Sequence, residues 1–173
     1  MQPTDNTRGR RKPKVYLAGP LFSVAERTFN EMLTRTLEDL VDVYLPQRDG
    51  GLISEMIRDG IPSDMAVRRV FRGDMNAIRE ADYLIAILDG RAIDEGVAFE
   101  LGVGYMLSKR CVGLQTDSRR LASWGNNPMI AGALEFVFHS VEDLLLWIRS
   151  PSERIVASLD NSDSLDMEDR AAS

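Results

Sequence analysis

Short apolar runs alternate with amphipathic segments along most of this chain, and this alternation limits the fold more than any other feature. The apolar runs have the length of buried strands and cover residues 14–19, 41–46, 82–88, 110–115 and 134–139. Gly-Pro closes the first run and Pro46 stops the second. Strands and helices that alternate in this way form a parallel sheet with helices on both faces. We therefore expect an α/β fold with five strands.

Helical patterns fill most of the intervals between these runs. Ser23 and Glu26 form a capping-box motif, and apolar residues follow it at helical spacing. Further helices are expected from Ser63 to Glu80, over residues 94–109, near Pro128 and after Ser140. The segment between Pro46 and Ser63 has the composition of a loop, with room for one short helix.

The length and the ends of the chain indicate one domain between two tails. The 173 residues are enough for a single domain with a sizeable core. Residues 1–13 are polar and basic without periodicity, and residues 151–173 are polar and increasingly acidic. We expect both segments to be disordered and the domain to cover residues 14–150.

Charge and cysteine content exclude several classes of protein. A net charge of −6 and a pI of about 4.9 argue against nucleic acid or an anionic membrane as a partner. No apolar run approaches the roughly 20 residues of a membrane span, and no hydrophobic segment follows the charged N-terminus. With one cysteine and one histidine, a disulfide framework and a Cys/His zinc site are excluded. We expect a cytoplasmic protein.

An acidic motif lies where such a sheet binds ligands. Ligands bind at the carboxyl ends of parallel strands, and the motif "DGRAIDEGVAFELG" (residues 89–102) follows the third expected strand. Within it, Glu100 lies in an apolar stretch that also contains glycine and alanine. A partly exposed helix glutamate is the ordinary explanation. The second explanation is a nucleophilic role. The small neighbours favour it, because they let a ligand approach Glu100. A carboxylate in such a hollow suits covalent attack on an electrophilic carbon.

Four other residues join Glu100 as candidates. Asp94 has the ordinary role of a helix N-cap, Asp89 of a turn residue, Asp74 of a solvated helix acid and Tyr16 of a strand core residue. Their joint placement is more informative than any one of them. One carboxylate can act as nucleophile and another as proton donor if their environments separate their pKa values.

Four motifs, in order, resemble the nucleoside 2-deoxyribosyltransferases. They are "VYLAGPLF", "GDMNAIREADYLIAILDG", "DEGVAFELGVGYMLSK" and "NPMIAGAL", and the resemblance covers roughly residues 14–139. It implies a flavodoxin-like open five-stranded parallel sheet. It also implies cleavage of the N-glycosidic bond of a 2'-deoxynucleoside and transfer of the deoxyribosyl group to a free purine or pyrimidine base, without metal or cofactor.

The resemblance also assigns roles to individual residues. Glu100 corresponds to the nucleophile that attacks C1', and Tyr16 to the tyrosine that positions it. Asp74 and Asp94 correspond to acids around the base and sugar, and Asp94 is the better candidate for moving a proton on the base. Asn127 corresponds to an asparagine contributed by an adjacent subunit, which implies a homo-oligomer. Further substrate contacts are expected at Phe22 as an aromatic wall of the base pocket and at Gly19, Pro20, Gln47, Asp89, Gly90 and Met129.

Two other functions remain open. A 2'-deoxynucleoside 5'-monophosphate N-hydrolase shares this fold and nucleophile. The loop "AGPLFS" lacks the glycine- and serine-rich character of a phosphate loop, and Pro20 has no N–H to donate, although Ser23 and Arg27 could bind phosphate. The other function is a non-catalytic nucleotide-binding module. A receiver domain of that kind would carry acids at the end of the first strand, where this chain has Ala18, Gly19 and Pro20.

Overall fold

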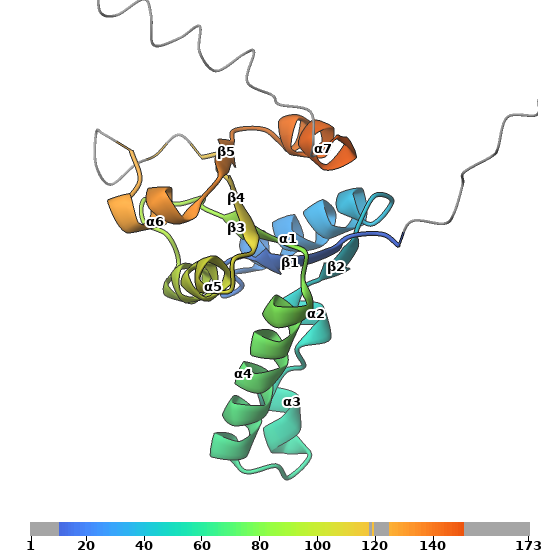
Figure 1. Cartoon of the computed structure of the whole chain (residues 1–173). Helices are drawn as coiled ribbons and strands as arrows, with labels where there is room; N and C mark the ends of the chain where they lie inside the picture. The colour runs from blue at the N-terminus through green and yellow to red at the C-terminus, as the bar shows by residue number, and fades with distance from the viewer. Residues whose placement is uncertain (1–10, 118, 120–124, 151–173) are drawn as a thin grey trace, which may run out of the picture.

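Five parallel strands form one open sheet in the order β2-β1-β3-β4-β5. The computed structural model describes residues 11–117, 119 and 125–150, so most of both expected tails lies outside the described residues. The strands are β1 (Lys14–Ala18), β2 (Asp42–Tyr44), β3 (Tyr83–Ile87), β4 (Arg110–Leu114) and β5 (Phe136–Phe138). The expected flavodoxin-like α/β fold is confirmed (Figure 1).

Helices connect the strands, and local capping signals set where most of them begin. They are α1 (Val24–Leu37), α2 (Pro46–Asp49), α3 (Ile53–Arg58), α4 (Ser63–Glu80), α5 (Glu95–Met106), α6 (Pro128–Ala133) and α7 (Val141–Arg149). Ser23 and Glu26 form the expected capping box on α1. Ser140 caps α7 by accepting a hydrogen bond from the backbone of Asp143.

The segment after β2 differs from the expectation of a loop with at most one helix. It contains two short helices, α2 and α3, and the second strand ends at Tyr44. Pro46 begins α2 because its fixed φ suits a first helical turn, where the missing N–H would have no partner in any case.

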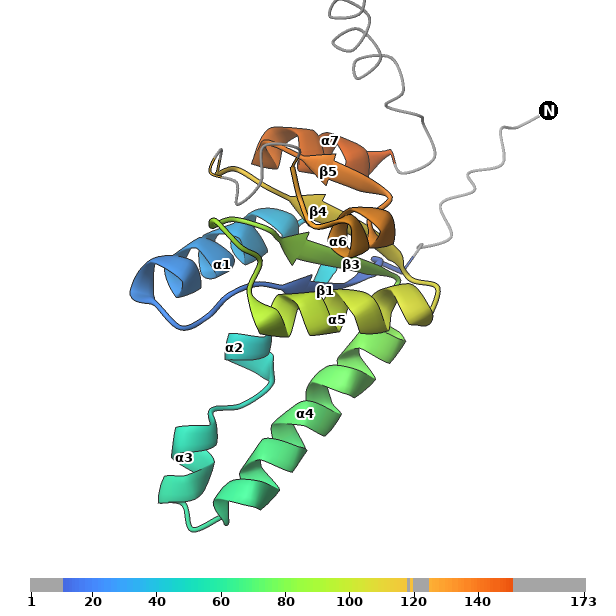
Figure 2. The same ribbon diagram turned by 90° about the vertical axis from the view of Figure 1, so that its left-hand side faces the viewer.

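Both faces of the sheet are covered, and alternate residues of β1 face opposite layers. Val15 and Leu17 pack in the core beneath α1 and α7. Tyr16 and Ala18 pack in the other core, together with residues of α4, α5 and α6. Figure 2 shows α5 and α1 on opposite sides of the strands. This alternation places the hydroxyl of Tyr16 on the face covered by α5.

The helices α3 and α4 project from the sheet as an arm (Figures 1 and 2). They pack against each other, and within α4 only Ala66 and Ile78 are buried. The arm leaves several large apolar side chains of α3 and α4 exposed: Ile53, Ile57, Met65, Val67 and Phe71. Within the described residues, no helix combines the length and the apolar character that crossing a membrane requires.

Candidate active site

The site begins at the contact between α5 and β1. The side chain of Tyr16 is 0% exposed, and Glu100 on α5 is half-buried. The Tyr16 hydroxyl donates a hydrogen bond of 2.6 Å to Oε1 of Glu100. A hydrogen bond of this length to an ionised carboxylate is among the strong ones in proteins. Glu100 is therefore held in one orientation by a residue that is distant in the sequence.

Burial and nearby charge weaken the acidity of Glu100. Loss of solvation raises its pKa to about 7, and the negative charges of Asp74 and Asp94 act in the same direction. The hydrogen bond from Tyr16 opposes this rise, because it favours the ionised carboxylate. Burial and the charge of Glu100 raise the pKa of Tyr16 as well, so the phenol keeps its proton and remains a donor.

A second tyrosine–carboxylate pair lies beside the first. Tyr44 is the register partner of Tyr16 in the sheet, and the two rings stack with centroids 5.5 Å apart and planes 16° apart. The Tyr44 hydroxyl donates a hydrogen bond of 3.0 Å to Oδ1 of Asp74. Burial raises the pKa of Asp74, whereas this hydrogen bond lowers it. Asp74 is thus a half-buried member of the site and not a solvated helix acid.

Tyr44 is the site residue that sequence reasoning missed. Its position at the carboxyl end of a buried strand was the available signal, because ligands bind at such ends. The pairing of Tyr44 with Tyr16 depends on the register of two strands that are far apart in the chain. That register cannot be derived from either strand alone.

Asp94 acts as the expected N-cap of α5 and also lies within electrostatic reach of Glu100. Its Oδ1 accepts hydrogen bonds from the backbone of Gly96 at 2.9 Å and of Val97 at 3.1 Å. Its charge contributes to the raised pKa of Glu100. The helix start therefore fixes Asp94 in the same region as the other two carboxylates.

Asp89 ties together two loops at the carboxyl ends of β3 and β4. Its carboxylate accepts hydrogen bonds of 2.6 Å from the backbone and the hydroxyl of Thr116, and one of 2.8 Å from the backbone of Asp117. Gly90 follows with a φ of 110°, which a residue with a side chain rarely adopts. Gly90 lines a cavity of about 280 Å³ together with Pro20, and another of about 170 Å³ together with Asn127.

The substrate-binding candidates in the first loop and Gln47 of α2 are placed differently from one another. Phe22 is 78% exposed. Gly19 packs closely against α1 and β3, since an added Cβ would lie 2.9 Å from both Asn30 Oδ1 and Ile87 Cδ1. Gln47 is engaged internally: its Oε1 accepts a hydrogen bond from Asn30 and its Nε2 donates one to the backbone of Arg27.

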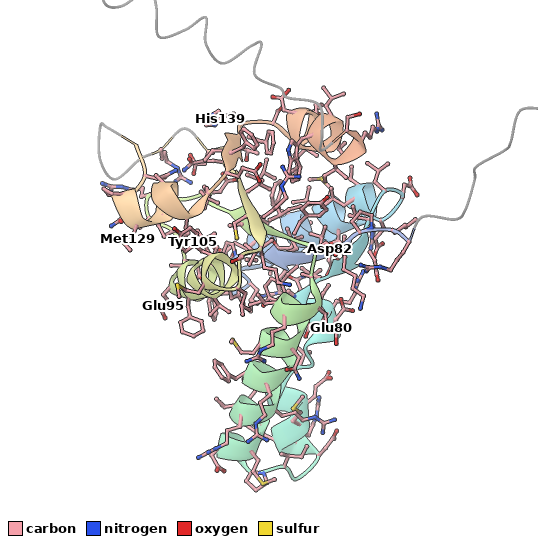
Figure 3. All side chains as sticks on the ribbon, viewed as in Figure 1. Glu80, Asp82, Glu95, Tyr105, Met129 and His139 are labelled. Atoms are coloured by element: carbon pink, nitrogen blue, oxygen red, sulfur yellow. The ribbon has the colours of Figure 1, made fainter. Side chains whose placement is uncertain are left out.

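Asn127 and Met129 lie at the start of α6. Asn127 is exposed and caps α6 by accepting a hydrogen bond of 2.9 Å from the backbone of Met129. Met129 is 81% exposed, and Figure 3 shows it on the same side of the molecule as Glu95 and Tyr105 of α5.

The loop before Asn127 is anchored to the end of β4. Gln115 is buried, and its side-chain amide exchanges two hydrogen bonds with that of Asn126. This pair fixes the start of α6 relative to the sheet.

The chemistry that these residues offer is that of clustered carboxylates. No three His, Cys, Asp or Glu side chains of the described segments are arranged so that they could hold a metal ion. Glu100, Asp74 and Asp94 together give a region of negative potential, which favours a cationic centre that develops in a reaction. Retaining glycosidases use a carboxylate for the same purpose and as a nucleophile.

Comparisons with known proteins agree with this chemistry. The family model for nucleoside 2-deoxyribosyltransferase matches residues 15–165. A search among curated proteins finds no match. A conserved protein from Enterococcus faecalis V583 has 31% sequence identity and a TM-score of 0.67, over 80% of this chain and 98% of that chain. A 2-deoxyribosyltransferase from Bacillus psychrosaccharolyticus has 26% identity and a TM-score of 0.63, over 76% and 89% of the two chains.

A more distant structure shares the fold. The CMP N-glycosidase of Clostridium botulinum has 17% identity and a TM-score of 0.50, over 79% of this chain and 98% of that chain. Since the family model spans most of the sequence, this chain belongs to the nucleoside 2-deoxyribosyltransferase family, whose enzymes act on N-glycosidic bonds.

Proposed function

We propose that this protein transfers the deoxyribosyl group of a 2'-deoxynucleoside to another purine or pyrimidine base through a covalent intermediate on Glu100. The observation that carries the proposal is the 2.6 Å hydrogen bond from Tyr16, which holds a half-buried carboxylate in one orientation. Fixed orientation of a nucleophile supplies a large part of the rate of such a reaction.

In the first step, an oxygen of ionised Glu100 forms a bond to C1' while the bond from C1' to the base nitrogen breaks. The electron pair of that bond leaves with the base, which takes a proton. Asp94 relays that proton from solvent to the base: in the described part of the chain its cap bonds go to Oδ1, which leaves Oδ2 for the base. The carboxylates around C1' stabilise the positive charge that develops there.

In the second step, a nitrogen of the acceptor base attacks C1' and the ester bond to Glu100 breaks. Asp94 passes the proton of the acceptor nitrogen to solvent, and the enzyme returns to its starting state. Each step inverts C1', so the product has the anomeric configuration of the donor. Neither step calls for a metal ion or an organic cofactor.

The remaining roles concern binding of the substrate. Phe22 is assigned to a wall of the base pocket, which its exposed ring allows. Gly19 and Pro20 are assigned to substrate contacts in the same loop, and Asp74 and Gln47 to contacts with the base and sugar. Asp89 and Gly90 shape the neighbouring loop, because Asp89 holds the backbone after β4.

A second copy of the chain completes the site in this proposal, with Asn127 reaching the sugar of the adjacent subunit and Met129 assigned to substrate contact. Both residues are exposed. An apolar groove of about 490 Å³ between α4 and α5 supports self-association, and its lining includes Met75, Phe99, Val103 and Met106. Monomeric proteins rarely expose continuous apolar surface of this kind.

The first loop argues against a nucleoside monophosphate as the substrate. The backbone N–H groups of Phe22 and Ser23 donate hydrogen bonds of 3.0 and 2.7 Å to Oε2 of Glu26. These groups at the start of α1 would otherwise suit a phosphate. Arg27 also donates to the backbone of Leu21. An anion of the protein thus occupies the place that a phosphate would need.

A transfer assay tests the proposal. The protein is mixed with a deoxynucleoside or its 5'-monophosphate, with and without an acceptor base, and the products are separated by chromatography. We expect a new deoxynucleoside only when the acceptor is present, and a mass shift on the peptide that contains Glu100 during turnover. Release of free base from the monophosphate alone would identify a hydrolase.

Variants of two acids on the same helix provide the control. Glu100→Gln removes the nucleophile and should lower the transfer rate by at least about a thousandfold. Glu95→Gln changes an exposed residue in the first turn of α5 and should retain the wild-type rate. Turnover by Glu100→Gln equal to that of the wild type would rule out the covalent mechanism.

A further inference from the structure

Two tyrosine–carboxylate pairs lie side by side in the site, and the tyrosine of the second pair has no role in the mechanism above. Tyr16 donates to Glu100, and Tyr44 donates to Asp74. The stacked rings join the pairs, because β1 and β2 place Tyr16 and Tyr44 in register on the same face of the sheet. The two pairs therefore form one connected unit.

The Tyr44–Asp74 pair is enclosed by elements from three parts of the chain. Tyr44 ends β2, Asp74 lies on α4, and the turn at Gly50 closes over both. A Cβ at Gly50 would lie 3.1 Å from Oδ1 of Asp74 and 3.3 Å from the hydroxyl of Tyr44. The turn at Gly50 thus limits the movement of the Tyr44 hydroxyl and of the Asp74 carboxylate.

Charges from three helices act on the phenol of Tyr44. They are Asp49 at the end of α2, Asp74 on α4 and Glu100 on α5. Together with burial, they raise the pKa of Tyr44, so the phenol stays protonated and donates to Asp74 over the working pH range. In the described part of the chain, Tyr44 is the hydrogen-bond partner of Asp74.

We propose that Tyr44 is a positioning residue: its hydroxyl holds the carboxylate of Asp74 in place, and its ring keeps the Tyr16 phenol aligned with Glu100. This inference rests on the proposed function. Tyr44 acts through its two neighbours and forms no bond with the substrate. Its hydroxyl and its ring contribute separately, so they can be removed one at a time.

Tyr44→Phe removes the hydroxyl and keeps the ring. A hydrogen bond to a charged group is worth about a tenfold factor or more in rate, so we expect kcat to fall about tenfold or further. The midpoint of thermal unfolding should stay close to that of the wild type. Tyr44→Leu also removes the stacked ring and should lower kcat more than Tyr44→Phe does.

Tyr83→Phe is the matched control. Tyr83 is a partly buried tyrosine of the same sheet, but it packs on the opposite face, edge-on to Trp147. Its variant should retain the wild-type kcat. A wild-type kcat in Tyr44→Phe as well would overturn the proposal.

A double-variant cycle separates action through Asp74 from a general packing role. If the hydroxyl works through Asp74, the double variant Tyr44→Phe/Asp74→Asn should have a kcat within about twofold of that of Asp74→Asn alone. If the reductions in kcat of the two single variants instead multiply in the double variant, the two residues act independently, and the proposal is overturned.

A titration of the Asp74 carboxyl carbon by NMR provides a measurement without substrate. Loss of the Tyr44 hydrogen bond should raise the pKa of Asp74 in Tyr44→Phe, because that bond favours the ionised carboxylate. An unchanged titration would overturn the proposal even if kcat fell.

A wild-type protein that cleaves no nucleoside would overturn the proposed function and this inference with it. An active wild type with an unaffected Tyr44→Phe would overturn this inference alone.

Discussion

At the residue scale, opposing effects act on the ionisation of Glu100, the half-buried carboxylate that we propose as the nucleophile. Burial and two neighbouring acids favour its neutral form, whereas the hydrogen bond from Tyr16 favours the anion. The balance raises its pKa to about 7. A carboxylate tuned in this way is a better nucleophile than a fully solvated one, because its anion is less stabilised by water, yet enough of it is ionised at neutral pH.

The pH dependence of the reaction follows from this balance. The attacking form of Glu100 is the anion, so kcat/KM should rise with pH and level off above about pH 7. Tyr16→Phe removes the bond that favours the anion, so the pKa of Glu100 should rise and the acid limb should move to higher pH. Rate profiles of both proteins between about pH 5 and 9 check this expectation. An acid limb that stays in place in Tyr16→Phe would contradict it.

At the element scale, α5 builds most of the site. Asp94 caps its first turn, Glu100 faces Tyr16, and Gly104 lies against the sheet. An added Cβ at Gly104 would lie 2.9 Å from Leu84 Cδ1 and 3.1 Å from Cys111 Sγ. Gly102 has no atom within 4 Å of such a Cβ and lines the apolar groove. Gly104 therefore sets the distance from α5 to the sheet, and Gly102 does not.

Alanine substitutions test this difference. Gly104→Ala should lower the free energy of unfolding by about 1–2 kcal/mol, because overpacking of the sheet outweighs the gain in helix propensity. It should also lower activity by shifting Glu100 relative to Tyr16. Gly102→Ala should leave stability equal or higher, since only the propensity changes. Urea unfolding of both variants measures the effect, and equal losses would contradict the assignment.

At the scale of the whole molecule, the arm and α5 form a continuous apolar face. Phe71 of α4 and Phe99 of α5 are both about half exposed, and their ring centroids lie 6.2 Å apart. Removal of such a face from water is the main driving force for association of subunits. In the proposal above, a second copy of the chain covers this face and brings the exposed Asn127 to the neighbouring site.

A charge placed on this face should separate the subunits. Met106 is 78% exposed and lines the groove, so Met106→Glu should shift the protein to the monomer and abolish most of the transfer activity. Leu146→Glu is the control, because Leu146 is 57% exposed on α7 at the other side of the sheet. Analytical ultracentrifugation measures the mass of each variant in solution and so shows whether it is a monomer.

Complementation tests the contribution of Asn127 to the neighbouring site. Glu100→Gln and Asn127→Ala should each be nearly inactive alone. When they are co-expressed, a mixed dimer contains one intact site, so activity should return to at most about a quarter of the wild-type level. No return of activity in mixed oligomers would mean that Asn127 serves its own subunit.

Local patterns determined the elements of this protein. Apolar runs, capping residues and prolines act over a few residues, which is why the five strands and the long helices appear where the sequence predicts them. The ordered motifs were also enough to identify the family. The segment from Pro46 to Arg58 was the local failure, because two short helices have too few residues to show a period.

Only the tertiary structure decided how the site is assembled. Tyr16 and Tyr44 stack because β1 and β2, which are distant in the sequence, pair in one register. Asp74 is half-buried because α4 brings it to the hydroxyl of Tyr44. The raised pKa of Glu100 likewise comes from desolvation and from charges on other parts of the chain. Such properties depend on distances through space between residues far apart in sequence, and spacing along the chain carries no measure of those distances.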